Sequence, residues 1–145
     1  YGITVRSYDT SGNTTDSEPI TLVVYKTVEL WGVVYSIENT TVLDLSYSGL
    51  SGSIPPEIGN LTNLTELKLV DNQLTGSIPP EIGNLTNLTQ LWLCCNELTG
   101  EIPIEICNLN IGEMYYFSIY NNQLCPPYPS CIEDYVGEQD TSNCP

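Results

Sequence analysis

The sequence predicts an α/β solenoid, in which each coil of chain carries one short strand and returns through a short helical segment. The block GSIPPEIGNLTNLT occurs twice without a change, from Gly52 to Thr65 and again from Gly76 to Thr89, which sets a 24-residue period. Leucines, glycines, isoleucines and prolines repeat at the same step outside this block. A fixed period between about 20 and 50 residues is the sequence signature of a stacked array. The aligned sets are Leu43, Leu67 and Leu91; Leu45, Leu69 and Leu93; Leu50, Leu74 and Leu98; Gly52, Gly76 and Gly100; Ile54, Ile78 and Ile102; and Pro55, Pro79 and Pro103.

Residues 1–24 predict a β-hairpin that precedes the array. ITVRSYD and PITLVV are rich in β-branched residues, and the polar segment TSGNTTDSE between them is typical of a turn. The stretch resembles the last two strands of an immunoglobulin-like or fibronectin-type-III-like domain, and this resemblance implies that the rest of such a domain lies before Tyr1. Because an isolated hairpin is marginally stable in water, we expect it to pack on another part of the molecule.

Each coil of the array can be derived from the unit that spans residues 65–88. In the strand LKL, the two leucines point to the same side, because side chains alternate along a strand. Asn72 follows where a side-chain amide can bond backbone groups of a turn, and equivalent asparagines would stack into a ladder. The segment SIPPEIGNLTNL returns along the far side, where Leu85 and Leu88 cover one side of a short helical turn. Since one coil cannot bury its own leucines, the coils must share a core and place their strands in a parallel β-ribbon.

Residues 65–88 match the pattern LxxLxLxxNxLxGxIPxxIxxLxx, and over residues 41–124 the chain resembles the plant-type leucine-rich repeat. Plant leucine-rich-repeat receptors, polygalacturonase-inhibiting proteins and bacterial surface proteins carry this repeat. The resemblance divides the array into the units 41–64, 65–88, 89–114 and 115–124. The first unit has Ser48 where the ladder asparagine is expected, and the third is two residues longer than the second.

Residues 25–40 are expected to form the N-terminal cap of the array. The segment ELWGVV resembles the WxGVxC segment of plant N-terminal caps, which implies that Trp31 plugs the end of the core. Tyr35 replaces the cysteine of that pattern, so the hairpin of residues 1–24 could supply cover in place of a disulfide. The missing cysteine and the immunoglobulin-like hairpin favour a bacterial surface protein over a plant protein.

Residues 125–145 are expected to form a C-terminal cap that carries disulfides. The segment NNQLCPPYPSC resembles the C-terminal cap of the family, and the resemblance implies that Cys125 pairs with Cys131 and Cys107 with Cys144. By sequence alone, four cysteines allow three pairings. Six cysteines in a chain of this composition suggest an oxidising compartment, and hence an extracellular or cell-surface location.

Cys94 and Cys95 stand apart from the cap cysteines. They occupy variable positions of the third unit, where they could form a vicinal disulfide or remain as two thiols. A metal site is a weak alternative, because zinc normally takes four ligands at defined spacing and the chain has no histidine. We therefore expect no metal and no cofactor.

Composition excludes several classes of function. The chain has 18 acidic and three basic residues and a net charge of −15, which disfavours nucleic acids and anionic membrane surfaces as partners. No apolar run approaches the roughly 20 residues that span a bilayer. Without histidine, Ser–His and Cys–His dyads are impossible, and no carboxylate pair is predicted to lie in a cleft. We expect a protein that is not an enzyme, and an acidic polysaccharide hydrolase is the disfavoured exception.

The outward side of the strand ribbon is the candidate binding surface. With the leucines pointing inward, alternation turns their neighbours outward, and large exposed aromatic side chains are the informative part of such a surface. They could stack on a sugar ring or anchor a protein partner, unless residues of the cap fold over them. The candidate residues are Asp44, Glu66, Lys68, Gln90, Trp92, Tyr116 and Tyr120.

The sequence thus predicts a secreted or cell-surface, non-catalytic module that recognises a protein or a glycan. The alternative is a structural role, as a spacer or as a subunit of an extracellular surface assembly or filament. In that case exposed strand edges could pair with a neighbouring copy, and the chain would self-assemble.

Overall fold

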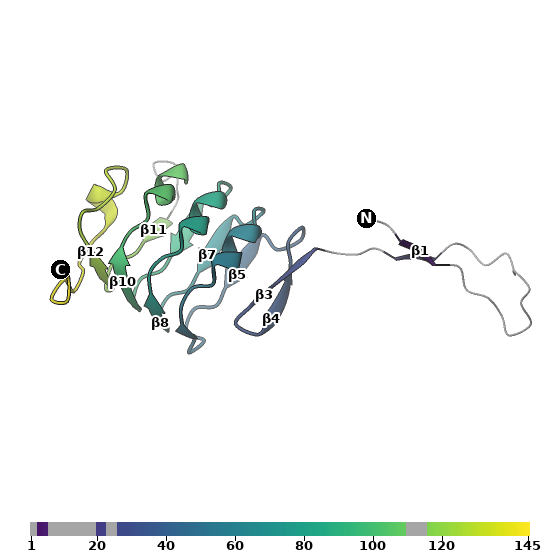
Figure 1. Ribbon diagram of the computed structural model, residues 1–145, viewed down its shortest axis with the longest axis horizontal. Coiled ribbons are helices and arrows are strands. Elements are labelled where there is room, and N and C mark those ends of the chain that lie inside the picture. The colour runs from purple at the N-terminus through teal and green to yellow at the C-terminus, as the bar shows by residue number, and fades with distance from the viewer. Residues whose placement is uncertain (1–2, 6–19, 23–25, 110–115) are drawn as a thin grey trace, which may run out of the picture.

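The computed structural model of the chain describes residues 3–5, 20–22, 26–109 and 116–145. Its main body is an array of stacked coils that runs from β3 to the C-terminal cap (Figure 1). Each coil contributes a strand to one parallel sheet, a strand to a second parallel sheet and, in the first three coils, a short 3-10 helix. The solenoid predicted from the sequence is therefore confirmed.

The first sheet contains one strand from each coil, in the order β5-β7-β9-β11. Its register joins equivalent residues, so that Leu67 lies between Leu43 and Leu91, and Leu91 pairs in turn with Phe117. The step between the first three strands is the predicted period, and the step into the fourth is two positions longer, as the longer third unit requires. The strands are β5 (Val42–Asp44), β7 (Glu66–Lys68), β9 (Gln90–Trp92) and β11 (Tyr116–Ser118).

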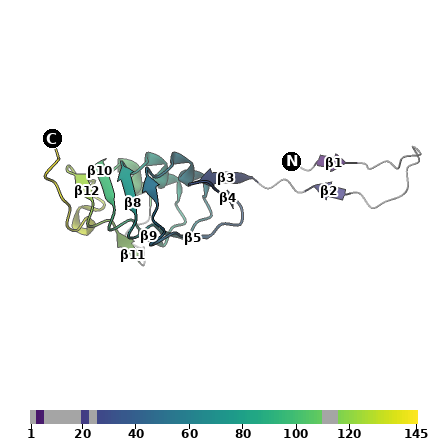
Figure 2. The ribbon, with the colours of Figure 1, turned by 90° about the horizontal axis from the view of Figure 1, so that it is seen from below.

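A second parallel sheet, which the sequence did not predict, has the order β6-β8-β10-β12. Figure 2 shows β8, β10 and β12 beside one another. Gln73 pairs with Ser51 and Glu97 with Thr75, so the step between its first three strands is two positions shorter than the period. The strands are β6 (Ser51–Gly52), β8 (Gln73–Gly76), β10 (Glu97–Glu101) and β12 (Gln123–Cys125).

The return of each coil begins with an extended proline and continues as a single 3-10 turn. In the second coil Pro79 has φ −69° and ψ 139°, and Pro80 opens the helix, where its missing N–H costs nothing. The predicted helical turn thus lies before Leu85 and Leu88, whose backbones form the next turn through a 3.0 Å hydrogen bond. Gly83 lets the coils approach closely, because a Cβ there would lie 2.4 Å from the Glu105 carbonyl oxygen. The helices are η1 (Pro56–Asn60), η2 (Pro80–Asn84) and η3 (Ile104–Asn108).

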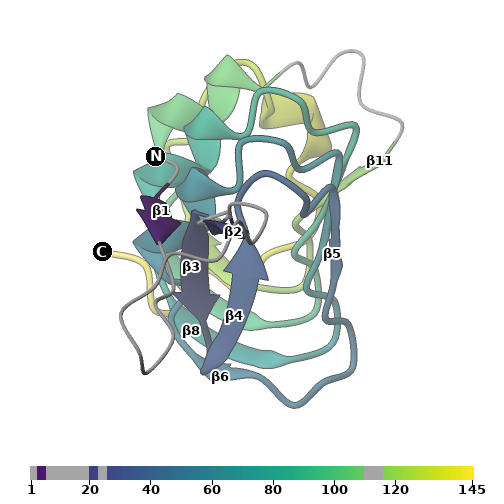
Figure 3. The ribbon, with the colours of Figure 1, turned by 90° about the vertical axis from the view of Figure 1, so that its right-hand side faces the viewer.

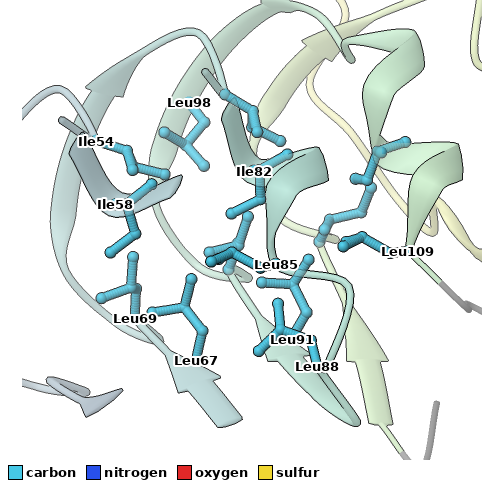
Figure 4. Packing of buried hydrophobic residues seen from close by; sticks show 14 of the residues in the cluster. Ile54, Ile58, Leu67, Leu69, Ile82, Leu85, Leu88, Leu91, Leu98 and Leu109 are labelled. Atoms are coloured by element: carbon cyan, nitrogen blue, oxygen red, sulfur yellow. The ribbon is translucent and has the colours of Figure 1, made fainter. Parts of the chain in front are cut away.

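One continuous hydrophobic cluster fills the array. Leu67 from β7, Leu69 just after it, Ile82 from η2 and Leu85 from the return segment point into the same interior (Figure 4). Leu93 is also fully buried, whereas the equivalent Leu45 in the first coil is partly buried. The leucines of successive coils therefore share one core, as predicted.

Buried asparagines form the predicted ladder beside this core. The Asn96 amide donates to the carbonyl oxygens of Leu69, Leu93 and Cys94 at 2.9–3.2 Å, and its Oδ1 accepts the Leu74 N–H at 3.1 Å. Asn72 and Asn122 make the equivalent bonds, each to backbone groups of its own coil and of the coil before it. At the C-terminal end Gln139 continues the ladder, because its amide donates to Ile119 and Val136 and accepts from Leu124.

The N-terminal end of the core is covered by the antiparallel pair β3 (Thr27–Leu30) and β4 (Val33–Ser36), which Figure 3 shows lying across the first coil. Val28 and Leu30 are the buried plug, while Trp31 lies in the turn at φ 48° and packs against the cluster from its side. The plug therefore precedes the predicted Trp31, because alternation along β3 turns every second side chain inward.

Further towards the N-terminus, β1 (Ile3–Val5) and β2 (Ile20–Leu22) pair antiparallel, as the predicted hairpin requires. Residues 6–19, where its turn was predicted, lie outside the described residues. In Figure 1 the pair lies beyond the β3–β4 end of the array.

The disulfide pairing implied by the family resemblance is wrong. Cys107 pairs with Cys131, with 5.8 Å between their Cα atoms, and Cys125 pairs with Cys144, with 5.6 Å. Cys107 lies in η3, and Cys131 follows it by 24 residues, which is one period of the array, so the two residues stack. The C-terminal tail then returns beside β12, where the backbone N–H of Asp140 donates to the Asn122 carbonyl oxygen, and this brings Cys144 to Cys125. Beyond Cys131 the cap contains the short 3-10 helix η5 (Glu133–Tyr135).

Candidate binding face

We use the term strand face for the outward side chains of β5, β7, β9 and β11 and of the residue two positions after each strand. The register of the first sheet arranges the strand residues in two rows that cross all four coils. Six of the seven candidate residues fall in these rows, and Tyr120 follows β11. The rows are Val42, Glu66, Gln90 and Tyr116, and Asp44, Lys68, Trp92 and Ser118.

The row that follows the strands is only partly exposed. Tyr120 is 44 % exposed, but Val70 is 9 % exposed and Cys94 3 %, so the expectation that all outward positions reach solvent fails here. The chain bends inward at this point to bring the ladder asparagines into the core, and the Asn72 and Asn96 amides bond the Val70 and Cys94 carbonyls. The solvent-exposed part of the strand face is therefore limited mainly to the outward side chains of the strands and to Tyr120.

Lys68, Trp92 and Tyr116 form a chain of contacts across three strands. The Lys68 ammonium lies 2.6 Å from Glu66 Oε2 and 5.8 Å from the centre of the Trp92 ring. Tyr116 meets Trp92 edge to face, with ring centres 5.3 Å apart and planes at 61°. Trp92 is thereby held on two sides, by a cation and by an aromatic ring, and it is not a free platform for a sugar.

The charges on the face are arranged around Lys68. The hydrogen bond to Glu66 raises the pKa of Lys68, so the two side chains neutralise each other at the surface, where such a pair contributes little stability. The backbone N–H of Ser46 donates to Asp44 at 3.1 Å and lowers the pKa of that carboxyl. Asp44 therefore stays ionised at neutral pH. Lys68 forms its salt bridge with Glu66, so the charge of Asp44 is not neutralised by a salt bridge to Lys68.

Two polar atoms in the same row have no hydrogen-bond partner among the described residues. They are Trp92 Nε1 and Ser118 Oγ, both buried, on neighbouring strands and directly paired in register. A buried donor without an acceptor costs free energy, and because both atoms are buried, a partner at the surface does not reach them.

Tyr47 is an aromatic residue that the sequence reasoning missed. It is 77 % exposed and lies in the turn after β5, at φ 56°, beside the next turn. A hydrogen bond to Asp71 raises the pKa of its hydroxyl. Its position was readable, since it is equivalent to Asp71 at the 24-residue step, but only the outward strand positions had been considered.

A polar cleft of about 360 Å³ opens at the C-terminal end of the array, and its lining includes Asn121, which follows Tyr120 in the chain. Gly137 lies against the Tyr120 side chain, where an added Cβ would be 2.7 Å from Tyr120 Cβ. Glu138 and Asp140 give the cleft its negative charge. Its lining residues are Asn96, Asn121, Asn122, Gln123, Glu138, Gln139 and Asp140.

The two remaining cysteines, Cys94 and Cys95, are free thiols at the edge of this face. In the described part of the chain, no three histidine, cysteine or acidic side chains lie close enough to hold a metal ion. Among the same residues, no helix has the length and apolar character needed to cross a membrane.

Comparison with known proteins agrees with this architecture. Residues 39–61 match a family model described as a leucine rich repeat, and residues 62–105 match one described as leucine rich repeats in two copies. A search of curated proteins finds no match. The chain thus carries leucine-rich repeats and folds as a leucine-rich-repeat solenoid.

Several solved structures resemble the chain. The plant peptide hormone receptor RGFR1 in complex with RGF2 is 43 % identical with a TM-score of 0.60, and the match covers 63 % of this chain and 14 % of the receptor chain. The BIR2 ectodomain from Arabidopsis thaliana is 33 % identical with a TM-score of 0.57, covering 63 % of this chain and 50 % of that one. The Arabidopsis receptor kinase HAESA, in complex with the peptide hormone IDA and the co-receptor SERK1, is 43 % identical with a TM-score of 0.53, covering 58 % and 14 %. The chain thus spans at most half the length of the structures that it resembles.

Proposed function

We propose that the chain is an extracellular, non-catalytic module whose strand face binds a peptide or an extended segment of a protein partner. The observation that carries this proposal is the edge-to-face pair of Trp92 and Tyr116 on the parallel sheet, with Tyr120 two positions after β11. Tyr116 is 49 % and Tyr120 44 % exposed. Exposed aromatic side chains on a fixed scaffold are typical anchors of protein interfaces. The comparison structures support the same function, since RGFR1 and HAESA are solved in complex with peptides.

A peptide suits the face better than a glycan. The Trp92 ring is already in contact with Lys68 and Tyr116, which leaves less of it free to stack on a sugar.

The charges of the site narrow the proposal to a peptide with a basic residue. Asp44 at one end of the face and Glu138 and Asp140 in the cleft at the C-terminal end of the array all offer carboxylates. Like charges across an interface are disfavoured, so an acidic partner is selected against.

Alanine substitution of the two exposed tyrosines tests the proposal. A peptide is selected from a random displayed library against the full chain, and its Kd is measured by titration calorimetry. Tyr116→Ala and Tyr120→Ala should each weaken binding about fivefold or more, because an anchor side chain contributes more than about 1 kcal/mol. Tyr135→Ala is the matched control, since Tyr135 is 54 % exposed in the cap helix η5, and its Kd should stay within about twofold. If no peptide is selected, or if the selected peptide binds both tyrosine variants as it binds the parent chain, the strand face is not the binding site.

The alternative, a spacer or subunit of an extracellular assembly, is favoured by one observation. Val33 and Val34 in β4 and Val42 in β5 are 51 %, 62 % and 49 % exposed near the N-terminal end of the array, where a neighbouring domain or copy would pack. Sedimentation velocity at high concentration separates the two functions. A monomer throughout the concentration range argues against assembly.

Two further inferences concern the parent protein. The pairing of β1 with β2 supports a strand pair before the array, and we propose that it ends an immunoglobulin-like domain. The bacterial origin remains a prediction, since the compared structures named above as plant or Arabidopsis proteins give it no support.

A further inference from the structure

We propose that Cys94 and Cys95 form a dithiol that low-molecular-weight disulfides convert reversibly into a vicinal disulfide. The chain holds two disulfides, Cys107–Cys131 and Cys125–Cys144, and leaves this adjacent pair free. The two residues are adjacent in the sequence, and burial, together with the neighbouring Cys94 thiol, raises the pKa of Cys95. No other cysteine among the described residues remains free to pair with them.

The position of the pair in the coil makes the two thiols unequal. Cys94 follows β9 and is 3 % exposed, whereas Cys95 is in the turn, at φ 61°, and is partly exposed. A reagent from solution therefore reaches Cys95 first. Asn121 Nδ2 lies 3.8 Å from the Cys95 sulfur and can stabilise it as a thiolate, although burial raises the pKa of Cys95 above its ordinary value.

The reaction is an ordinary exchange with a disulfide such as oxidised glutathione. The Cys95 thiolate attacks one sulfur of glutathione disulfide, a mixed disulfide forms, and one glutathione thiolate leaves and takes up a proton. The Cys94 thiol then loses its proton and attacks the Cys95 sulfur, which closes the vicinal disulfide and releases the second glutathione. Two protein thiols are oxidised, and one glutathione disulfide is reduced to two thiols.

The geometry of the backbone makes this bond easy to reduce again. Adjacent Cα atoms are about 3.8 Å apart across a trans peptide, which is shorter than the roughly 4.4–6.8 Å that disulfides span without strain. The two cap disulfides, at 5.8 and 5.6 Å, fall inside that range. Strained disulfides are the labile ones, so a mild reductant should open the Cys94–Cys95 bond and leave the caps intact.

The dithiol also contacts the strand face, and this second part of the inference rests on the proposed function. Interaction with the Cys94 thiol raises the pKa of Tyr120, and the backbone N–H of Cys95 donates to the Tyr120 carbonyl oxygen at 3.1 Å. Closing the disulfide draws the Cys94 sulfur to Cys95 and changes the turn whose Cys95 N–H bonds the Tyr120 carbonyl oxygen. Oxidation would then alter the binding of a peptide that uses Tyr120 as an anchor.

Mass spectrometry of the full chain tests the dithiol chemistry without any partner. The chain is treated with oxidised glutathione, remaining thiols are blocked with N-ethylmaleimide, and the intact mass of the chain is measured. The expected product is lighter by two hydrogens and takes up no maleimide, and reduced glutathione should restore both thiols while the cap disulfides survive. A lasting glutathione adduct, a covalent dimer or two unreacted thiols would each overturn the proposal.

Two single variants assign the order of events. Cys94→Ser should stop at the mixed disulfide on Cys95, whereas Cys95→Ser should react slowly or not at all, because Cys94 is buried. If Cys95→Ser reacts faster with the oxidant than Cys94→Ser, the reaction does not begin at Cys95.

The link to the strand face is measured separately, with the peptide selected above. Oxidation of the parent chain should change its Kd about fivefold or more, a coupling typical of linked sites, while Cys94→Ser/Cys95→Ser should not respond to the oxidant. An equal Kd before and after oxidation would contradict only the claim that oxidation alters peptide binding. The claim that Cys94 and Cys95 form a reversible disulfide is tested separately by the mass measurement.

Discussion

Asparagine side chains hold the turns of neighbouring coils together. Asn96 is 9 % exposed, and its amide bonds backbone groups of its own coil and of the coil before it. Turn backbone that is buried in the array has no water to bond, so these amides supply partners that the sheets do not. The same residue therefore shapes the turn and fixes the distance between coils.

Replacing Asn96 with alanine should destabilise the chain by at least about 2 kcal/mol, because several buried carbonyl and N–H groups lose their partner at once. Urea denaturation of the variant measures the free energy of unfolding. Asn60→Ala is the matched control, since Asn60 is exposed at the end of η1, and it should change stability by less than about 0.5 kcal/mol. Equal stability of the two variants would show that the ladder does not hold the coils.

For single residues, the sequence predicted correctly those positions that recur with the 24-residue period. Asn72, Asn96 and Asn122 were predicted in the ladder because each follows its strand at the same offset. Gln139 was missed, because it reaches the ladder from a tail that has no repeat spacing. The burial of Val70 and Cys94 was missed as well, since strict strand alternation ends where the chain bends inward.

The elements at the two ends close a core that the coils themselves leave open. β3 and β4 cover the first coil with Val28 and Leu30, and the disulfide-bearing cap covers the last coil with Ile132 and Val136. Terminal coils of an array need such covers, because each coil contacts only its neighbours. At the C-terminal end, the Cys107–Cys131 disulfide joins η3 to the cap, and its two cysteines are 24 residues apart, which is one period of the array.

Cleavage after glutamate distinguishes the pairing in the structure from the pairing implied by the family resemblance. Cys125 and Cys131 fall on one fragment, between Glu113 and Glu133. The structure predicts that this fragment stays linked under non-reducing conditions to two others, one with Cys107 and one with Cys144. The pairing implied by the family resemblance would instead close the fragment on itself.

The stability of the cap follows from the same bond. The double variant Cys107→Ala/Cys131→Ala should lose about 2–5 kcal/mol in free energy of unfolding, the usual cost of removing a native disulfide from a small domain. Cys94→Ala/Cys95→Ala, which removes no disulfide, is the control and should lose much less. A Cys107→Ala/Cys131→Ala variant as stable as this control would show that the cap is held by other contacts.

Among the elements, the strands of the first sheet and their register were predictable, because they repeat with the leucines. The pairing of Cys107 with Cys131 was readable in principle from their spacing of 24 residues, but the family pattern pointed to another pairing. The second sheet was not predictable from the period, since the register of its first three strands is offset by two positions from the repeat. The N-terminal cap was expected at residues 25–40, where β3 and β4 lie, but the side chains that plug the core are Val28 and Leu30 in place of Trp31.

Across the whole molecule, charge and shape separate the proposed binding surface from the rest. The chain carries 18 acidic residues, yet the strands of the first sheet hold two of them, Asp44 and Glu66, and Lys68 offsets one. The remaining acidity favours solubility and keeps copies of the chain apart. The aromatic side chains of the strand face thus lie on strands that carry few acidic residues.

The composition and the period were sufficient to predict which residues lie on the strand face. They did not predict the contacts that those side chains make with one another. Asp44, Lys68 and Trp92 were placed outward by alternation alone, and the register confirms that they form one row. The contact of Lys68 with Trp92 and the cleft at the C-terminal end of the array depend on side-chain conformations and on the cap, which the repeat does not encode.

The central claim is that successive coils stack in register, so that equivalent outward residues lie side by side on the strand face. Paired cysteines in a Cys94→Ser/Cys95→Ser background test it directly. Glu66→Cys/Gln90→Cys joins neighbouring strands, about 4.8 Å apart and within disulfide range, whereas Val42→Cys/Gln90→Cys lies two strands apart, at roughly twice that distance. Mild oxidation should close a bond within the chain in the first pair and leave both thiols free in the second. Closure of the second pair, or failure of the first, would contradict the stacked array.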